Sequence, residues 1–289
     1  MCSRAGEVDL NRHHPAPRPA ATDLLKDRLL WPLRQERSRF HLGTAGLDRW
    51  TSQMLRVADR DLERFYELLH DLRRTIGTRC LKECDGRMSW PERGVYFFFD
   101  DSEHRRDGVT PRVVRVGTHG VSTGSRTKLW DRLRIHRGTV SGGGNHRGSI
   151  FRLHVGTALL ARDESLSPKP QSWGKGSSAK REVREHEKHV EQAVSDYMSP
   201  MSFLHVLADD EPGPESIRKT IEANSITLLS QVGVAGSLAD PPSEDWLGHF
   251  CSHEAVRRSG LWNVQHVEYE YDSGFLDVLE TCVARTQRP

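Results

Sequence analysis

Hydrophobic residues recur at helical spacing along residues 53–76, where they follow one another at intervals of three, four or seven positions. This spacing gathers them on one face, so the sequence predicts an amphipathic helix that ends before Gly77. A shorter helix is expected near residues 24–33. Similar periodicity predicts helices at 125–138, 180–198, 215–231 and 273–285.

Two short apolar runs predict strands instead of helices. The run GVYFFFD predicts a buried strand at 94–99, and RVVRVGTHG predicts a second strand at 112–117. The charged connector at 100–111 suits an exposed loop between them. Residues 201–207 predict another strand, whereas 149–160 fit either a third strand or the start of a helix. Together these elements predict an α/β (α+β) fold with a small mixed sheet flanked by helices.

The elements divide the chain into three parts. Residues 1–50 mix Pro, Arg, His and Ala without periodicity, which predicts a poorly ordered leader. Residues 51–90 form a predicted N-terminal helical extension, and 91–289 form the main domain. Within that domain the composition shifts to Ser, Pro, Gly and Lys at about 161–180, which predicts a polar, exposed insertion.

Composition and charge narrow the class of protein. The 289 residues include 42 basic and 40 acidic side chains, a net charge of +2, so any basic binding surface must be local. Five scattered cysteines do not suggest a disulfide framework, and a reducing, cytoplasmic location is expected. The sequence holds no apolar run long enough to predict a membrane span.

Five short motifs follow one another in an order that resembles the GIY-YIG nuclease family. In that family, two motifs on neighbouring strands precede a helix that bears an arginine. A glutamate on a later helix binds a divalent metal, and an asparagine follows it. The corresponding motifs here are GVY (94–96), RVG (115–117), LWDRLRIH (129–136), TIEANSITLLS (220–230) and WNV (262–264).

The resemblance implies a GIY-YIG-like nuclease domain over residues 91–289. It also implies a metal-dependent endonuclease that cleaves nucleic acid, with DNA as the favoured substrate and Mg²⁺ or Mn²⁺ as the cofactor. No membrane partner is expected, and a monomer and a homodimer both stay open. The implied catalytic residues are Tyr96, Arg115, Arg132, His136, His146 and Asn263.

Arg132 and His136 are four residues apart, so a helix would carry both on one face. A guanidinium offers planar, paired donors that match phosphate oxygens, which suits a phosphate clamp. The alternative is an ordinary basic surface helix, because Arg134 and Arg137 lie on it too. Candidate nucleic-acid contacts are His119, Arg134, Arg137 and Arg147.

Glu222 lies between Ile221 and Ala223 in a predicted helix. A carboxylate is a hard oxygen ligand of the kind that Mg²⁺ prefers. The alternative is a surface glutamate paired with Arg218, one helical turn earlier. The position of Glu222 relative to the upstream strands and to the later Asn263 favours the metal role.

Tyr96 is expected to act as a base or to orient the attacking water, and the alternative is a buried tyrosine whose hydroxyl is satisfied within the protein. A free tyrosine has a pKa of about 10, so ionising it near pH 7 costs about 4 kcal/mol without help. Arg115 departs from the family pattern, since the second motif normally carries a tyrosine. Arginine donates to phosphate but cannot act as a base, so His119 and His146 also become candidates for that role. Strand alternation predicts that Arg115 shares a face with Val113 and Gly117.

A second hypothesis retains the fold without the chemistry, as a nucleic-acid-binding or regulatory module. The missing tyrosine of the second motif favours it, and dependence of DNA binding and cleavage on Mg²⁺ would separate the two. A third hypothesis, a helical interaction protein built on residues 53–76 and 180–198, depends on amphipathicity alone.

Overall fold

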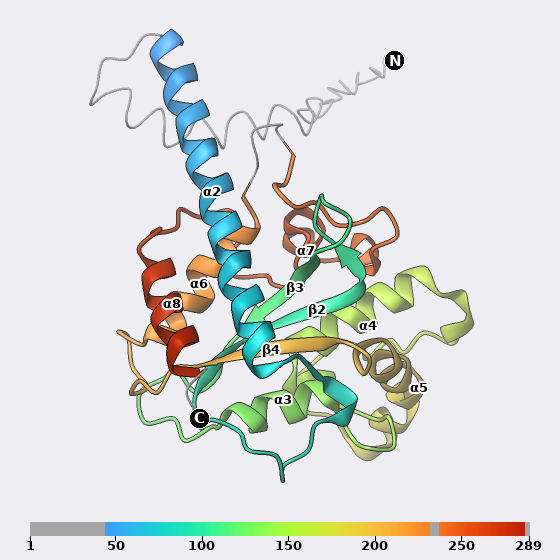
Figure 1. The fold of residues 1–289 in the computed structure, drawn as a ribbon. Coiled ribbons are helices and arrows are strands. Elements are labelled where there is room, and N and C mark those ends of the chain that lie inside the picture. Colours follow the sequence, from blue (N-terminus) through green and yellow to red (C-terminus); the bar gives the residue numbers. More distant parts are fainter. Residues whose placement is uncertain (1–43, 232–236, 287–289) are drawn as a thin grey trace, which may run out of the picture. The chain divides into compact units, whose positions relative to one another are not determined.

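The computed structural model describes residues 44–231 and 237–286 of the chain (Figure 1). The chain divides into two compact units, residues 1–53 and 54–289, and the fold given below is that of the second unit. The short helix expected at 24–33 lies outside the described residues.

A four-stranded antiparallel sheet forms the centre of the second unit (Figure 1). Its strands are β1 (Arg79–Cys80), β2 (Gly94–His104), β3 (Pro111–Gly117) and β4 (Ser202–Leu207), in the order β1-β4-β2-β3. Each predicted strand at 94–99, 112–117 and 201–207 is present. Because β2 pairs with both β3 and β4, it has no free edge.

The helices predicted within the described residues are present, and the ambiguous stretch at 149–160 is helical. Among the described residues, no helix has both the length and the apolar character needed to span a membrane. The α-helices are α2 (Thr44–Ile76), α3 (Leu129–Arg137), α4 (Ile150–Arg162), α5 (Arg181–Met198), α6 (Ile217–Leu229), α7 (Glu254–Ser259) and α8 (Phe275–Thr286). Short 3-10 turns lie at Leu81–Glu83, His146–Gly148, Glu164–Leu166 and Leu247–Phe250.

Helices cover both faces of the sheet, so residues 94–99 of β2 are buried on both sides (Figure 1). Val95 and Phe97 point toward a core built with α2, α6 and α8. Tyr96 and Phe98 point toward a second core built with α3, α4 and α5. Each large apolar side chain removed from water contributes about 1.5–3 kcal/mol. Burial on both faces explains why this strand is a continuous apolar run rather than an alternating one.

Residues 54–90 of the expected helical extension lie in the same compact unit as the domain expected at 91–289. The α2 side chains Phe65, Leu69 and Leu72 are at most 2% exposed and lie in the first core. The apolar positions that predicted the helix therefore also form the contact between this helix and the sheet.

A β-bulge interrupts the pairing of β2 with β3 between Phe98 and Phe99. Phe98 pairs with Arg115, whereas Phe99 pairs with Val113, so Val114 is the extra residue. Val113 consequently lies in the first core and Val114 in the second. The prediction that Arg115 shares a face with Val113 was wrong, because simple alternation assumes a strand without a bulge.

Candidate active site

Tyr96 lies across Gly117 on the neighbouring strand. The two residues are direct partners in the β2–β3 ladder. A Cβ atom at position 117 would lie 2.3 Å from the Tyr96 hydroxyl oxygen, far inside van der Waals contact. The glycine of the RVG motif therefore leaves the space that the tyrosine ring of the GVY motif occupies.

A chain of buried hydrogen bonds begins at Tyr96. Its hydroxyl is 2.8 Å from Nε2 of His136, and Nδ1 of His136 is 2.8 Å from the hydroxyl of Ser149. All three side chains are fully buried. Burial lowers the pKa of His136 well below its usual value, and the positive charges of Arg132 and Arg115 lower it further. His136 is therefore neutral at physiological pH.

The partner Ser149 was not among the predicted residues. It is the N-cap of α4, where its hydroxyl oxygen accepts a hydrogen bond from the backbone N–H of Arg152 at 3.2 Å. Recognising that 150–162 is a helix would identify Ser149 as its cap. Its contact with His136 depends on how α3 and α4 pack, and no local pattern encodes that.

Arg115 is 5% exposed and lies on the same side of the sheet as Tyr96. Its guanidinium donates to the backbone oxygen of Trp262 and lies 4.9 Å from the ring centre of Phe151. Burial lowers the pKa of Arg115, while its interactions with Tyr96 and Glu222 oppose that shift. An arginine keeps its proton even so, because its unperturbed pKa exceeds 12.

Glu222 extends toward Arg115 and the end of β3 from α6, which lies on the other side of that strand. Its Oε1 accepts a hydrogen bond from the backbone N–H of Thr118, directly after the RVG motif, at 3.1 Å. Burial raises the pKa of Glu222, and Arg115, the Thr118 N–H and Arg132 partly oppose that shift. The carboxylate thus lies in the field of two guanidinium groups.

Arg218 does not neutralise Glu222, contrary to the alternative that treats Glu222 as a surface ion-pair partner. The Arg218 side chain is fully buried, and its Nε donates to Asp210 at 2.6 Å. A second nitrogen donates to the backbone oxygen of His119. The positive charges that lower the pKa of Glu222 are those of Arg115 and Arg132 instead.

Arg132 lies one helical turn before His136 on α3, as the spacing predicted. It is half-buried, and its Nη1 donates to the backbone oxygen of Gly148 at 3.1 Å. Its charge lowers the pKa of His136 and opposes the raised pKa of Glu222. The structure therefore brings the predicted residues of α3, both strands and α6 into one electrostatic group.

Asn263 supports the site from the free edge of β3. Its Oδ1 accepts from the backbone N–H of Val116 at 3.1 Å, and its Nδ2 donates to the Val116 oxygen at 2.9 Å. The preceding residue, Trp262, donates its N–H to Val114 at 2.8 Å. Asn263 therefore holds the strand between Arg115 and Gly117 in place, and the side chain itself contacts backbone.

His146 and Arg147 lie outside this group, against the insertion and α5. Both ring nitrogens of His146 are engaged, with Glu191 at 3.0 Å and with the Gly174 N–H at 3.1 Å. Arg147 is buried and makes a paired contact with Glu187 at 2.6 and 2.8 Å. Since each polar group already has a protein partner, neither is available as a catalytic base or as a contact to nucleic acid.

The remaining predicted contacts differ in exposure. His119 is 5% exposed, its Nε2 is 3.1 Å from the Glu92 oxygen, and burial lowers its pKa to about 4. Arg137 lies over the ring of Trp130 at 5.2 Å and is half-buried. Arg134 is exposed. Of these three side chains, only Arg134 is exposed.

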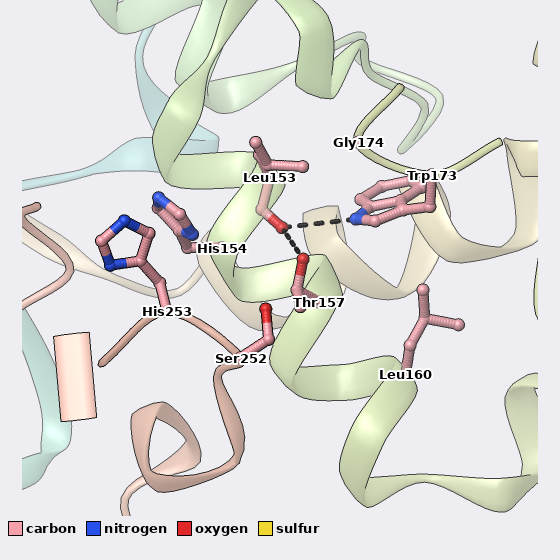
Figure 2. Close-up of a pocket in the computed structure, with 8 residues that line it drawn as sticks. All are labelled: Leu153, His154, Thr157, Leu160, Trp173, Gly174, Ser252 and His253. Atoms are coloured by element: carbon pink, nitrogen blue, oxygen red, sulfur yellow. Dashed lines mark hydrogen bonds between the residues drawn. The ribbon is translucent and has the colours of Figure 1, made fainter. Parts of the chain in front are cut away.

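A pocket of about 380 Å³ lies elsewhere, between α4, the insertion and the segment that precedes α7 (Figure 2). His154 and His253 face each other at its edge, with ring centres 5.2 Å apart, and Leu153 and Trp173 line another side (Figure 2). None of the predicted site residues lines it. The pocket and the candidate active site are therefore separate features.

A divalent metal would have one carboxylate ligand at the candidate active site. Across the described residues, no three His, Cys, Asp or Glu side chains are grouped to hold a metal ion. Oε2 of Glu222 makes no hydrogen bond with the described part of the chain, so it is available to a cation. A single carboxylate completed by water and substrate oxygens fits Mg²⁺, which keeps several waters in proteins.

Comparison with known proteins places the chain in a family. Neither the curated proteins nor the solved structures gave a match. The family model of the GIY-YIG domain matches residues 56–289, which includes both strands of the site, α3, α6 and Asn263. The fold expected from the sequence is confirmed, as is the resemblance to the GIY-YIG family. The chain belongs to the GIY-YIG domain family.

Proposed function

We propose that this protein is a metal-dependent endonuclease that hydrolyses phosphodiester bonds in DNA. Membership of the GIY-YIG family implies a nuclease-type function in general. The observation that carries the finer proposal is the convergence of Tyr96, Arg115, Arg132 and Glu222 at the ends of the paired motif strands. This set combines a hydroxyl, two fixed cations and a carboxylate, which are the groups that phosphodiester hydrolysis needs.

The two arginines would stabilise the negative charge that develops on the scissile phosphate. Arg115 is held between the Phe151 ring and the Trp262 oxygen, so its guanidinium is fixed before substrate arrives. Preorganised donors of this kind need no reorganisation at the moment of reaction. Arg132 adds a second cation from α3, and one of its nitrogens is bonded to Gly148.

Glu222 would hold Mg²⁺ or Mn²⁺ through Oε2, while Oε1 keeps its hydrogen bond to Thr118. When bound, such an ion acts as a Lewis acid that stabilises charge on phosphate oxygens. The Thr118 N–H fixes the carboxylate at the end of β3, close to Arg115 on the same strand.

Tyr96 would position the attacking water at the phosphate. Its hydroxyl is held by His136, and Arg115 interacts with it electrostatically. Arg115 stands where the family pattern has a tyrosine and cannot take a proton. We assign the base role to Tyr96, since His146 has both ring nitrogens engaged and His119 is buried, with its Nε2 3.1 Å from the backbone oxygen of Glu92.

The proposal is tested by cleavage of supercoiled plasmid DNA by the purified protein in Mg²⁺ or Mn²⁺. We expect Glu222→Ala to abolish cleavage and to leave the folded state intact by circular dichroism. Lys219→Ala on the exposed side of the same helix is the matched control and should cleave normally. Undiminished cleavage by Glu222→Ala would refute the role of this carboxylate.

The second candidate function, a nucleic-acid-binding or regulatory module, is favoured by one observation. Arg115 replaces the tyrosine of the second motif, and its buried contacts with Trp262 and Phe151 are also consistent with a structural role. Such a module would bind labelled DNA equally well with EDTA or Mg²⁺ and leave it intact. Metal-dependent cleavage in the same reactions would exclude this candidate.

A further inference from the structure

Residues 165–181, called the basic arm below, carry four basic side chains and no acidic one. The arm includes most of the polar insertion between α4 and α5 and ends at the first residue of α5 (Figure 1). Its basic side chains, Lys169, Lys175, Lys180 and Arg181, are all exposed. None of the four forms an ion pair with a described residue. In a chain with 42 basic and 40 acidic side chains, the arm is therefore a local excess of positive charge.

The middle of the arm is anchored to the body of the domain. The indole of Trp173 stacks on the ring of His146, with ring centres 3.9 Å apart, and its Nε1 donates to the backbone oxygen of Leu153 at 3.3 Å (Figure 2). The backbone N–H of Gly174 donates to Nε2 of His146 at 3.1 Å. A Cβ atom at Gly156 would lie 2.1 Å from a carbon of the indole, so this glycine leaves the space that Trp173 occupies. The arm is thus docked on α4, unlike a solvated linker.

Arg147 provides a second anchor beside the first. Its Nε donates to the backbone oxygen of Lys175 at 3.2 Å, and its Nη2 donates to that of Ser172 at 3.3 Å. Glu187 pairs with the same guanidinium, so this carboxylate neutralises Arg147 and leaves the charge of Lys175 uncompensated. Because the backbone is already ordered here, a ligand of the lysine does not bear the cost of ordering this loop.

The turn that holds the arm also contacts the candidate active site. Nη1 of Arg132 donates to the backbone oxygen of Gly148 at 3.1 Å, and Arg147 is the preceding residue of the same 3-10 turn. Arg132 and the arm are therefore bound to adjacent residues of one turn. Duplex DNA carries a phosphate charge about every 1.7 Å along its axis. A duplex with one phosphate at Arg132 therefore brings flanking phosphates close to the arm.

We infer that the basic arm binds the phosphate backbone of duplex DNA beside the cleavage site, through Lys175, Lys180 and Arg181. The choice of DNA as the partner rests on the proposed function. Contacts of cationic side chains with phosphates supply affinity and fix the orientation of the duplex, but they carry no sequence information. The arm thus contributes to affinity for any sequence, and it takes no part in the chemical step.

The test is binding of a fluorescein-labelled DNA duplex by the full-length protein, measured by fluorescence anisotropy in EDTA at several salt concentrations. The variant carries Lys175→Gln, Lys180→Gln and Arg181→Gln together. We expect about 10- to 100-fold weaker binding, and a salt dependence of log Kd that is smaller by about 1 for each lost phosphate contact. The substitutions leave Trp173 and Arg147 in place, so the variant should unfold at the wild-type Tm.

The matched control removes three charges from α2, which packs on the other face of the sheet. It carries Arg56→Gln, Arg60→Gln and Arg74→Gln, at exposed positions. We expect the control to bind the duplex as the wild-type protein does. Wild-type affinity in the arm variant, or an equal loss of affinity in the control, would overturn the inference. A wild-type protein that does not bind the duplex would overturn it as well.

Plasmid cleavage in Mg²⁺ distinguishes this inference from the proposed function. In the arm variant we expect KM to rise while kcat stays near the wild-type value, because the arm contacts phosphates other than the scissile one. A fall in kcat at unchanged KM would overturn this placement of the arm. Binding that depends on the arm in a protein that never cleaves DNA would refute the nuclease function and leave the binding surface standing.

Discussion

Replacement of Glu222 by Gln should make the protein more stable while it abolishes cleavage. Burial raises the pKa of this carboxyl, which means that the folded state disfavours its ionised form. Glutamine has the same shape, and its carbonyl oxygen can accept the Thr118 N–H bond that Oε1 accepts at 3.1 Å. The substitution thus removes the charge without opening a cavity or leaving the Thr118 donor unpaired.

The size of the expected gain in stability depends on how far neighbouring groups already compensate the buried charge of Glu222. Arg115, the Thr118 N–H and Arg132 all favour the ionised carboxylate, so the net penalty is smaller than that of an isolated buried charge. We expect a gain of about 0.5–2 kcal/mol, the range of single stabilising substitutions. For a chain of this size, each 1 kcal/mol raises Tm by about 2–4 °C.

The pH dependence has a definite sign. A carboxyl whose pKa is raised in the folded state does not change the free energy of unfolding while it is protonated in both the folded and the unfolded state. That condition holds below the unfolded pKa of about 4.3. As the pH rises above that value, the unfolded chain loses its proton first and the folded state becomes relatively less stable. The Tm advantage of Glu222→Gln should therefore be absent near pH 4 and complete at neutral pH.

Differential scanning fluorimetry of both proteins in EDTA, from acidic to neutral pH, measures this difference. Adding Mg²⁺ should then raise the Tm of the wild-type protein and not that of Glu222→Gln, because a ligand stabilises only the state that binds it. A Tm difference that is constant with pH would show that the carboxyl charge is not its cause. An equal Mg²⁺ response in both proteins would refute Glu222 as the metal ligand.

Two other substitutions test how the site is held. Gly117→Ala would place a methyl group 2.3 Å from the Tyr96 oxygen, so we expect a loss of about 1–3 kcal/mol in chemical denaturation and loss of cleavage. Gly213→Ala, which meets no atom within 4 Å, is the matched control. Arg152→Met would break a buried ion pair and leave Glu191 partly uncompensated, so urea denaturation should show a loss of about 3–5 kcal/mol. A near-native midpoint would show that this pair is replaceable.

Much of the fold and several site contacts follow from local sequence patterns. An antiparallel hairpin places the two motifs opposite each other, so their last residues, Tyr96 and Gly117, are paired once the register is set. The four-residue spacing of Arg132 and His136 fixes them on one helical face before any tertiary contact forms. Periodicity and strand spacing alone determine these relations.

What could not be predicted depends on which buried polar groups meet in space. Arg218 is one turn from Glu222 on α6, yet it pairs with Asp210 outside the helix. His146 follows the arginine helix, which made it a candidate base, but Glu191 and the insertion engage both of its nitrogens. Asp210 lies eight residues before Arg218, ahead of α6, and Glu191 lies 45 residues after His146. Loop conformation and helix packing set these partners, and residue type and spacing do not encode them.

The Arg115 substitution becomes intelligible from the charges around it. A tyrosine at this position would be neutral, so the site would contain one cation, Arg132, and one anion, Glu222. Arginine adds a second permanent cation, and the Trp262 oxygen and the Phe151 ring offset part of its desolvation. Two guanidiniums against one carboxylate leave the resting site net positive. That balance favours a polyanionic substrate in a protein whose overall charge is only +2, and it supplies locally the basic character that the composition lacks.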